Sequence, residues 1–229
     1  MSIFAIADIH LSKNPGISKP MDIFGDRWID HENRIEKNWR ELVHDEDTVI
    51  IPGDISWAMK LEDSIYDLNW ISELPGKKVM LKGNHDLWWT GINRLNSMYE
   101  DNIRFLQYDS VTVEGVSICG TRGWITPDDD EFTEADEKIY RRELLRLESS
   151  LQAAECDEII GFMHFPPVAK PMSFSGFQQL FEDYSVKQVY YGHIHGEEGF
   201  KRTIQGEYHG IEYHLISADY LNCKPIKIK

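Results

Sequence analysis

The chain has 229 residues, a formal net charge of −15, 41% hydrophobic residues and 12% aromatic residues. This length and composition are typical of a globular α/β protein, and we expect a single domain over residues 1–229. The acidic charge repels phosphate backbones, so binding to extended nucleic acid is not expected. No apolar run is long enough to cross a bilayer, so no membrane partner is expected either.

The N-terminus is predicted to be a strand. Residues 3–7 are apolar and lead straight into Asp8, without the basic segment that opens a secretory signal. The three cysteines, Cys119, Cys156 and Cys223, are scattered and predict neither a disulfide framework nor a thiolate zinc site. We therefore expect a cytoplasmic protein with reduced thiols.

The first half of the chain alternates helices and strands. Residues 11–30 form a long loop rich in Pro, Gly, Ser and Lys, and the aromatic residues Phe24 and Trp28 predict that it packs as a flap beside the functional site. Apolar periodicity and turn residues then predict, in order, a helix around residues 35–42, a strand at 48–51, a helix around 61–68, a strand at 78–81 and a helix from Leu87 to about Met98.

The second half of the chain contains more strands. Runs at 103–106, 110–113 and 116–119 are separated by turn residues, which predicts two hairpins. The sequence Thr133-x-x-Asp136 predicts a helix start. Beyond it we expect a helical stripe through Ala154, a strand at 158–163, a short helix near 176–184, a strand at 186–191 and an antiparallel pair at 200–204 and 211–216. This order implies two packed sheets with helices outside.

Polar side chains follow five of the predicted strands. The carboxyl ends of strands in an α/β core converge in space, and ligands bind there. Residues that follow these strand ends are Asp8 and His10, then Asp54, then Asn84, His85 and Asp86, then His164, and finally His193 and His195.

Each polar cluster has an ordinary structural explanation when it is taken alone. An Asp-x-His after a strand suits a cap, a Gly-Asp step is common in turns, and His164 before two prolines suits packing. The pair His193 and His195 is stronger evidence of a metal site, because both imidazoles share one face of an extended chain. The ordered set, with each member after an apolar run, favours a metal centre.

The ligand chemistry narrows the choice of metal. Imidazole combined with carboxylate suits Mn, Fe, Zn or Ni, whereas an all-oxygen site would suit Mg or Ca. The number of candidate ligands is too large for one tetrahedral zinc. Two ions that share one bridging carboxylate, typically about 3.5–4 Å apart, fit better.

The blocks D-x-H, G-D, G-N-H-D, H and G-H-x-H occur in this order between Asp8 and His195. This pattern resembles the calcineurin-like metallophosphoesterase superfamily. The resemblance implies an α/β fold, a four-layer α-β-β-α sandwich of two mixed sheets flanked by helices. It also implies one ion held by Asp8, His10, Asp54 and His195, and a second held by Asp54, Asn84, His164 and His193. The sequence departs from many relatives after Asp54, where Ile55, Ser56 and Trp57 follow, which weakens the assignment to a particular subfamily. The stretch 120–124, Gly-Thr-Arg-Gly-Trp, and the tryptophans Trp57, Trp88 and Trp89 resemble features of a bacterial phosphohydrolase subgroup.

The resemblance also implies a reaction. Two divalent ions would lower the pKa of a bridging water, and the resulting hydroxide would attack the phosphorus of a phosphate ester. His85 is predicted to protonate the leaving group. Asp86 is predicted either to orient His85 or to cap the next helix. Arg122 is predicted either to bind a substrate phosphate or to pair with a nearby carboxylate.

We therefore expect a phosphoric ester hydrolase that acts on a small phosphodiester. The alternatives are a phosphomonoesterase or protein phosphatase of the same superfamily, or a metal-binding scaffold without turnover. The acidic charge speaks against a nuclease of long strands. The sequence leaves the substrate, the native metal pair and the oligomeric state open.

Overall fold

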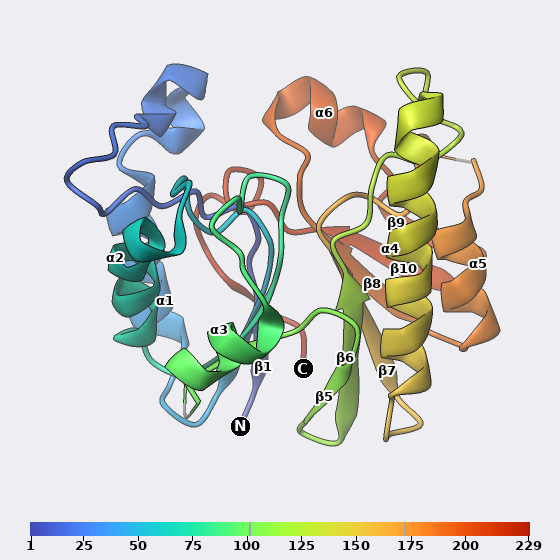
Figure 1. The fold of residues 1–229 in the computed structure, drawn as a ribbon, viewed down its shortest axis with the longest axis horizontal. Helices are drawn as coiled ribbons and strands as arrows, with labels where there is room; N and C mark the ends of the chain where they lie inside the picture. Colours follow the sequence, from blue (N-terminus) through green and yellow to red (C-terminus); the bar gives the residue numbers. More distant parts are fainter. Residues whose placement is uncertain (101, 172) are drawn as a thin grey trace.

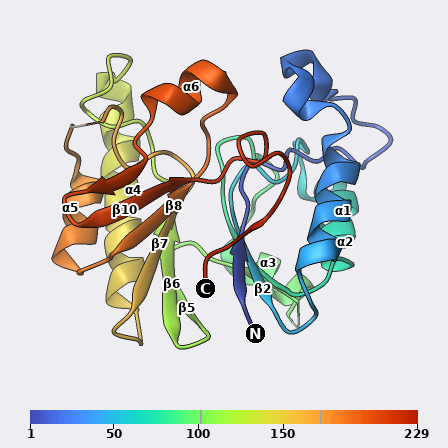
Figure 2. The same ribbon diagram turned by 180° about the vertical axis from the view of Figure 1, so that it is seen from behind.

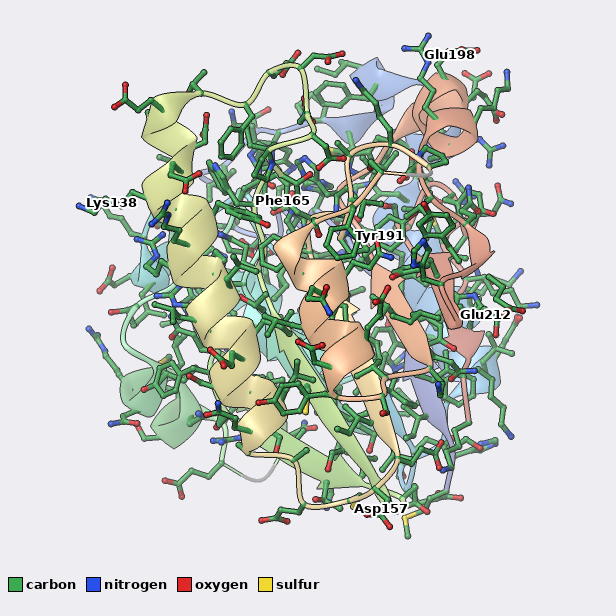
Figure 3. All side chains as sticks on the ribbon, turned by 90° about the vertical axis from the view of Figure 1, so that its right-hand side faces the viewer. Lys138, Asp157, Phe165, Tyr191, Glu198 and Glu212 are labelled. Carbon is green, nitrogen blue, oxygen red and sulfur yellow. The ribbon has the colours of Figure 1, made fainter. Side chains whose placement is uncertain are left out.

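The computed structural model describes residues 1–100, 102–171 and 173–229. Two β-sheets face each other in the middle of the molecule, and helices cover both outer faces (Figures 1 and 2). This four-layer order confirms the predicted fold class. The covering helices are α1 (His31–Leu42) and α2 (Leu61–Ser72) on the first sheet, and α4 (Glu134–Gln152) and α5 (Gly176–Asp183) on the second (Figure 3).

The first sheet is built from the N-terminal strands and one C-terminal strand. Its order is β11-β1-β2-β3-β4, and every neighbouring pair is parallel except β11 with β1. Its strands are β1 (Ile3–Ala5), β2 (Thr48–Pro52), β3 (Lys77–Leu81), β4 (Ile103–Phe105) and β11 (Ile226–Lys227).

The second sheet has the order β5-β6-β7-β8-β10-β9. Its inner strands β6, β7, β8 and β10 are parallel, and the edge strands β5 and β9 are antiparallel to their neighbours. The strands are β5 (Ser110–Val113), β6 (Val116–Thr121), β7 (Ile159–Met163), β8 (Gln188–Tyr191), β9 (Gly206–Tyr208) and β10 (Ile211–Leu215).

Alternation along the strands produces separate cores between the layers. In β1, Phe4 packs toward the helices of the first sheet, whereas Ile3 and Ala5 pack into the space between the two sheets. In β2, Val49 likewise packs toward the helices and Ile50 packs into the space between the sheets. Because successive side chains of a strand point to opposite faces, strands buried on both sides need apolar residues at every position. This explains the continuous apolar runs in the sequence.

The start of α4 confirms the predicted capping box. Thr133 is the N-cap residue, its side chain accepts from the backbone of the third helical residue, and Asp136 accepts the backbone N–H of Thr133 at 3.0 Å. These bonds satisfy donors that a helix otherwise leaves free at its N-terminus.

The prediction that a helix begins at Leu87 is wrong for the first turn. Residues 87–91 are non-helical, and α3 runs over Ile92–Met98. The rings of Trp88 and Trp89 are buried against Phe105, and the Trp88 indole N–H donates to Asp86 at 3.0 Å. Side-chain burial fixes this segment in place of helical hydrogen bonds.

Two further predictions are corrected by the strand pairing. The strands β4 and β5 form no hairpin, because β4 pairs with β3 in the first sheet and β5 pairs with β6 in the second. The segment predicted as a strand at 200–204 lies largely in a helix, α6 (Gly196–Arg202). Acidic residues in its first turn and basic residues in its last turn favour this helix electrostatically. The antiparallel partner of β10 is β9.

The predicted flap, residues 11–30, contains two short 3₁₀ turns, Met21–Phe24 and Asp26–Trp28. Figure 1 shows these turns (blue) and α6 (orange) at the same end of the molecule, the end where the parallel strands finish. No helix among the described residues is long and apolar enough to cross a membrane.

Candidate metal centre

The candidate residues lie in the loops that leave the carboxyl ends of both sheets. Asp8, Asp54 and Asn84 follow β1, β2 and β3 of the first sheet, and His164 and His193 follow β7 and β8 of the second. The backbone ties these loops together, since the Asp8 N–H donates to Gly53 and the Asp8 carboxylate accepts the His193 N–H at 2.9 Å. The two sheets therefore meet at this point.

The loop backbones are strained at the candidate residues. Asp8, His10, Asp54 and His193 have φ angles of 56°, 44°, 51° and 71°, in the left-handed region that L-residues rarely adopt. Such strain persists only where the surrounding structure imposes it, and it concentrates at functional sites. Four of the candidate residues therefore lie on strained backbone.

Glycines in the sequence blocks permit the close approach of the loops. A Cβ on Gly83 would lie 2.1 Å from Oδ1 of Asp54, and a Cβ on Gly192 would lie 2.4 Å from Oδ2 of Asp8. Real Cβ atoms do not come so close to other atoms. The glycine before Asn84 and the glycine before His193 thus make room for the carboxylates.

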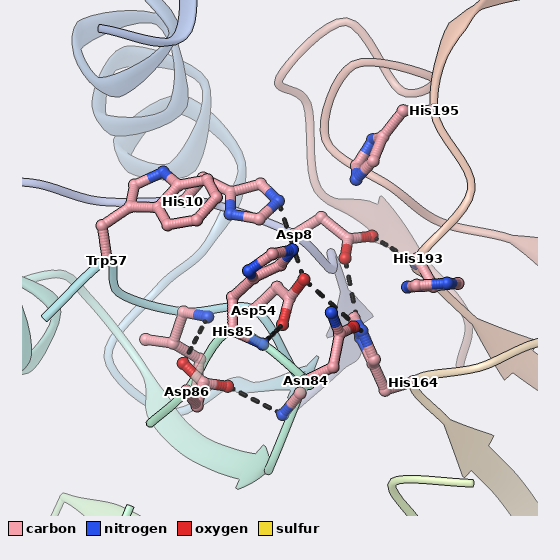
Figure 4. Close-up of polar contacts among 12 residues, drawn as sticks. Asp8, His10, Asp54, Trp57, Asn84, His85, Asp86, His164, His193 and His195 are labelled. Carbon is pink, nitrogen blue, oxygen red and sulfur yellow. Dashed lines mark hydrogen bonds and ion pairs between the residues drawn. The ribbon is translucent and has the colours of Figure 1, made fainter. Parts of the chain in front are cut away.

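Six side chains form two adjacent groups with the chemistry of metal ligands (Figure 4). Within each group, one ligand atom from each residue lies within 4.8 Å of the others. Asp54, a member of the second group, also lies close to the first: its Oδ2 is 3.4 Å from Nε2 of His164 and 3.8 Å from Nε2 of His10. The first group is Asp8, His10 and His195, and the second is Asp54, His164 and His193.

Nε2 of His164 and Oδ1 of Asn84 lie next to each other in the second group's part of the site. Nδ1 of His164 lies 3.2 Å from the carbonyl oxygen of Pro52, which can only accept, so Nδ1 carries the proton. Burial lowers the pKa of His164 well below its usual range, so the ring is neutral and Nε2 bears a lone pair. That atom is 2.6 Å from Oδ1 of Asn84, another acceptor. A cation at this position would satisfy both atoms.

Unpartnered atoms in the first group also fit a cation. Oδ1 of Asp8 and Nδ1 of His10 are buried and have no hydrogen-bond partner among the residues that the structure describes. Burial raises the pKa of Asp8 to about 7, and it lowers the pKa of His10 well below its usual value. The pKa of His193 is lowered in the same way, chiefly by burial. Neutral imidazoles are the form that binds metals, and a nearby cation would offset the desolvation that raises the pKa of Asp8.

His195 has a carboxylate partner that the sequence analysis missed. Its Nδ1 lies 2.9 Å from Oδ1 of Asp219, and Oδ2 of Asp219 accepts the Gly196 N–H at 3.1 Å. Burial lowers the pKa of His195, but the bond to Asp219 and the charge of Asp8 raise it, and the net shift is upward. Asp219 follows β10, so its place after a strand is the signal that could have revealed it.

His85 lies at the exposed side of the site. Its backbone N–H donates to Oδ1 of Asp54 at 2.8 Å, which fixes the loop. Its side chain is exposed, and its ring centroid is 4.6 Å from that of Trp57 and 5.8 Å from that of His10. It belongs to neither ligand group.

Asp86 is fully buried and binds the loop after β2. Its carboxylate accepts the backbone N–H groups of Ile55 at 2.9 Å, Ser56 at 3.2 Å and Gly83 at 2.7 Å, and the Trp88 indole. These bonds join the loop of Asp54 to the loop of Asn84. Among the contacts of the described residues, none joins the Asp86 carboxylate to the ring of His85, and the role of orienting His85 stays a prediction. The alternative, that Asp86 caps the next helix, is wrong, because Gly91 is the N-cap residue of α3.

Arg122 lies after β6, close to the second group. Its carbonyl oxygen accepts the backbone N–H of His164 at 3.2 Å. Its guanidinium lies 3.3 Å from the fully buried Glu143 and stacks over the ring of Trp124 at 4.6 Å. The structure thus shows the pairing with a carboxylate, and the predicted phosphate contact stays a prediction.

A cavity of about 350 Å³ opens onto the site. Residues of the two groups form its base, and His85 lies at its side. The flap forms another part of its wall through Met21, Phe24 and Trp28. The flap was predicted to pack beside the site through its aromatic rings. Trp28 is buried there, whereas Phe24 is exposed.

Comparison with known proteins gives a family and a fold. The model of the calcineurin-like phosphoesterase family matches residues 1–197. The Gene 66 protein of Mycobacterium phage L5 is 37% identical over 82 residues, which make up 35% of this chain and 37% of that protein. The matched segment therefore spans little more than a third of that relative.

Two solved structures are similar over nearly the whole chain. A protein of unknown function from Aquifex aeolicus has a TM-score of 0.54 and 17% identity, covering 99% of this chain and 95% of that one. The phosphopantetheinyl hydrolase of Mycobacterium tuberculosis has a TM-score of 0.59 and 14% identity, with the same coverage of 99% and 95%. At these identities, the similarities show a shared fold.

Proposed function

The chain belongs to the calcineurin-like phosphoesterase family, and from this premise we propose that it is a dinuclear metal-dependent hydrolase of a small phosphate ester. The observation that supports the proposal best is the placement of Asp54 between two groups of potential ligands. A carboxylate in that position can bridge two cations. The contact of His164 with Asn84, at 2.6 Å, brings two further candidate ligands of the second ion together.

In this proposal Asp8, His10, Asp54 and His195 hold one ion, and Asp54, Asn84, His164 and His193 hold the other. When two divalent ions are bound at such a site, they supply an activated water and neutralise charge on the phosphoryl group. Imidazole and carboxylate ligands suit Mn, Fe, Zn or Ni. The protein fixes these ligands through the strained loops and through the bond from Asp219 to His195.

We assign proton donation to His85. Its ring is exposed beside the cavity and is in neither ligand group, so it is free to give a proton to the leaving oxygen. A positioned general acid is worth about 10²–10⁴ in rate. Asp86 would support this role indirectly, since its carboxylate holds the loops that carry Asp54 and His85.

A small phosphodiester is our preferred substrate, and a phosphomonoester is the alternative. To test the function, metal-stripped protein is loaded with manganese, its metal content is measured, and hydrolysis of an aryl phosphodiester is compared with that of the matching monoester. Two ions per chain with turnover of the diester supports a phosphodiesterase, and preference for the monoester supports a phosphatase. Two bound ions with no turnover of either compound would favour a scaffold.

A further inference from the structure

The wall of the cavity beside the site is apolar. Apart from the residues at its base and His85 at its side, it is lined by Met21, Phe24, Trp28, Trp57 and Gly196. No lysine or arginine occurs among the described residues that line it. Among these lining residues an anionic substituent would find no lysine or arginine to pair with, whereas an apolar group would find aromatic rings and a thioether.

This wall begins next to His85. The Trp57 ring centroid is 4.6 Å from that of His85, and the ring stacks on His10 with centroids 4.8 Å apart and planes at 18° (Figure 4). A leaving group that takes a proton from His85 must lie beside Trp57. The apolar wall is thus on the leaving-group side of the proposed site.

Several bonds hold the wall in place. The Trp57 indole N–H donates to the sulfur of Met21 at 3.2 Å, and the Lys19 ammonium lies 5.6 Å from the Trp57 ring centroid. Arg27, within the flap, donates to the carbonyl oxygen of Asp219 and to Oδ1 of Asn222, both at 3.1 Å. A wall that is already ordered costs less to occupy than one that must be ordered on binding.

Exposed apolar side chains occur in the wall and next to it along the chain. Phe24 is 63% exposed and the adjacent Ile23 is 72% exposed. Large apolar side chains that gather at a pocket mouth are typical of a binding surface. The cavity of about 350 Å³ is at the small end of the range of roughly 300–1,000 Å³ for ligand pockets. Its size suits a single ring better than a long chain or a folded partner.

We propose that this wall binds an apolar, ring-bearing leaving group, so that the substrate is a small phosphate ester of a ring-bearing alcohol. The proposal rests on the proposed phosphoesterase function, whose reacting phosphate would lie over the two ligand groups. It assigns the contact with the ring to Phe24, Trp57 and Met21. It predicts selectivity for the leaving group even when two alcohols are equally basic.

The test compares compounds that differ only in the ring. Binding of 2-phenylethylphosphonate and ethylphosphonate to the manganese-loaded protein is measured by calorimetry, and kcat/KM is measured for the corresponding 2-phenylethyl and ethyl phosphate esters. We expect the phenyl compound to bind about tenfold more tightly or better, the effect of burying a phenyl-sized group. We expect Phe24→Ala to reduce this ratio several-fold, and Phe174→Ala, at an exposed phenylalanine that does not line the cavity, to leave it unchanged.

The two measurements separate this proposal from the proposed function. Equal binding of the two phosphonates, absence of binding by both, or a ratio that Phe24→Ala leaves intact would overturn the assignment of the wall. Selective binding of the phenyl compound without turnover of either ester would support the wall and contradict the hydrolase. Trp57 is left unchanged in this test, because its loss would also remove the ring that stacks on His10.

Discussion

Nδ1 of His195 lies 2.9 Å from Oδ1 of Asp219, a carboxylate that is itself buried. A carboxylate behind an imidazole fixes its tautomer and raises its basicity toward a metal. We therefore expect Asp219→Asn to lower the affinity for the ion at this histidine by about 10–100-fold. Calorimetric titration of metal-stripped protein with manganese measures the change. Glu198→Gln, at an exposed residue of α6, is the control, and equal affinity of Asp219→Asn and wild type would contradict the role of Asp219.

A second prediction concerns the close approach at Gly83. Its Cβ would lie 2.1 Å from Oδ1 and 2.2 Å from the backbone nitrogen of Asp54, so Gly83→Ala must displace the loop of Asp54. We expect a lower melting temperature and loss of bound metal. Gly91→Ala is the matched control, because nothing lies within 4 Å of its Cβ and its φ is −58°. If both variants bind metal like the wild type, the loops are less tightly packed than the structure shows.

A third prediction separates proton donation by His85 from metal binding. His85→Ala should keep the metal content, since His85 is in neither ligand group. It should lower kcat by about 10²–10⁴ for an alkyl ester, whose leaving oxygen needs a proton. The loss should be much smaller for a p-nitrophenyl ester, whose leaving group departs as an anion. Equal losses for both esters would show that His85 does not act as the general acid.

The fourth prediction is a pH dependence of stability that arises away from the site. Asp67 is fully buried, and its carboxylate accepts the Lys13 N–H at 2.7 Å and the Ser56 hydroxyl. Burial raises its pKa to about 6, although these bonds oppose the shift. The ordinary value is about 3.9, so the folded state binds the extra proton between roughly pH 4 and pH 6. The contribution of Asp67 to stability is present below pH 4 and is lost as the pH rises to 6.

Asp67→Asn should remove this contribution. The free energy of unfolding of the wild type relative to the variant should fall by about 2–3 kcal/mol between pH 4 and pH 6.5. Urea unfolding with a chelator present measures both proteins without bound metal. The other buried carboxylates are common to both proteins, so they cancel in the difference. Parallel stability curves over this range would show that Asp67 has an ordinary pKa.

The sequence alone was sufficient to predict which candidate residues lie together at the ends of the strands. Parallel strands that are buried on both faces have continuous apolar runs, so their ends are visible, and the polar residues after them meet at one edge. The structure brings together Asp8, Asp54 and His164 as this rule predicts. Their roles as ligands remain a proposal.

The sequence was insufficient where long-range contacts decide. The place of Asp219 after β10 marks it as a candidate polar residue, but only the path of the chain back toward the first sheet brings it to His195. Likewise, Trp88 follows a pattern that suits a helix start, but its indole bonds to Asp86 instead. In α6 the acidic residues at the start and the basic residues at the end favour a helix, although residues 200–204 were predicted as a strand. The errors at Asp219 and Trp88 arose where tertiary contacts outweigh local pattern, whereas at α6 the local charge order was the better signal.

Each ligand group takes its side chains from both sheets, so bound ions would restrict the movement of one sheet relative to the other. Asp8 and His10 come from the first sheet and His195 from the second, while Asp54 faces His164 and His193 in the same way. An occupied site would therefore clamp one half of the molecule to the other. Hydrogen exchange of the amides in β1 and β7 would slow together when the ions bind, although these strands belong to different sheets. Bound ions would thus stabilise the packing of the two sheets against each other in addition to taking part in the reaction.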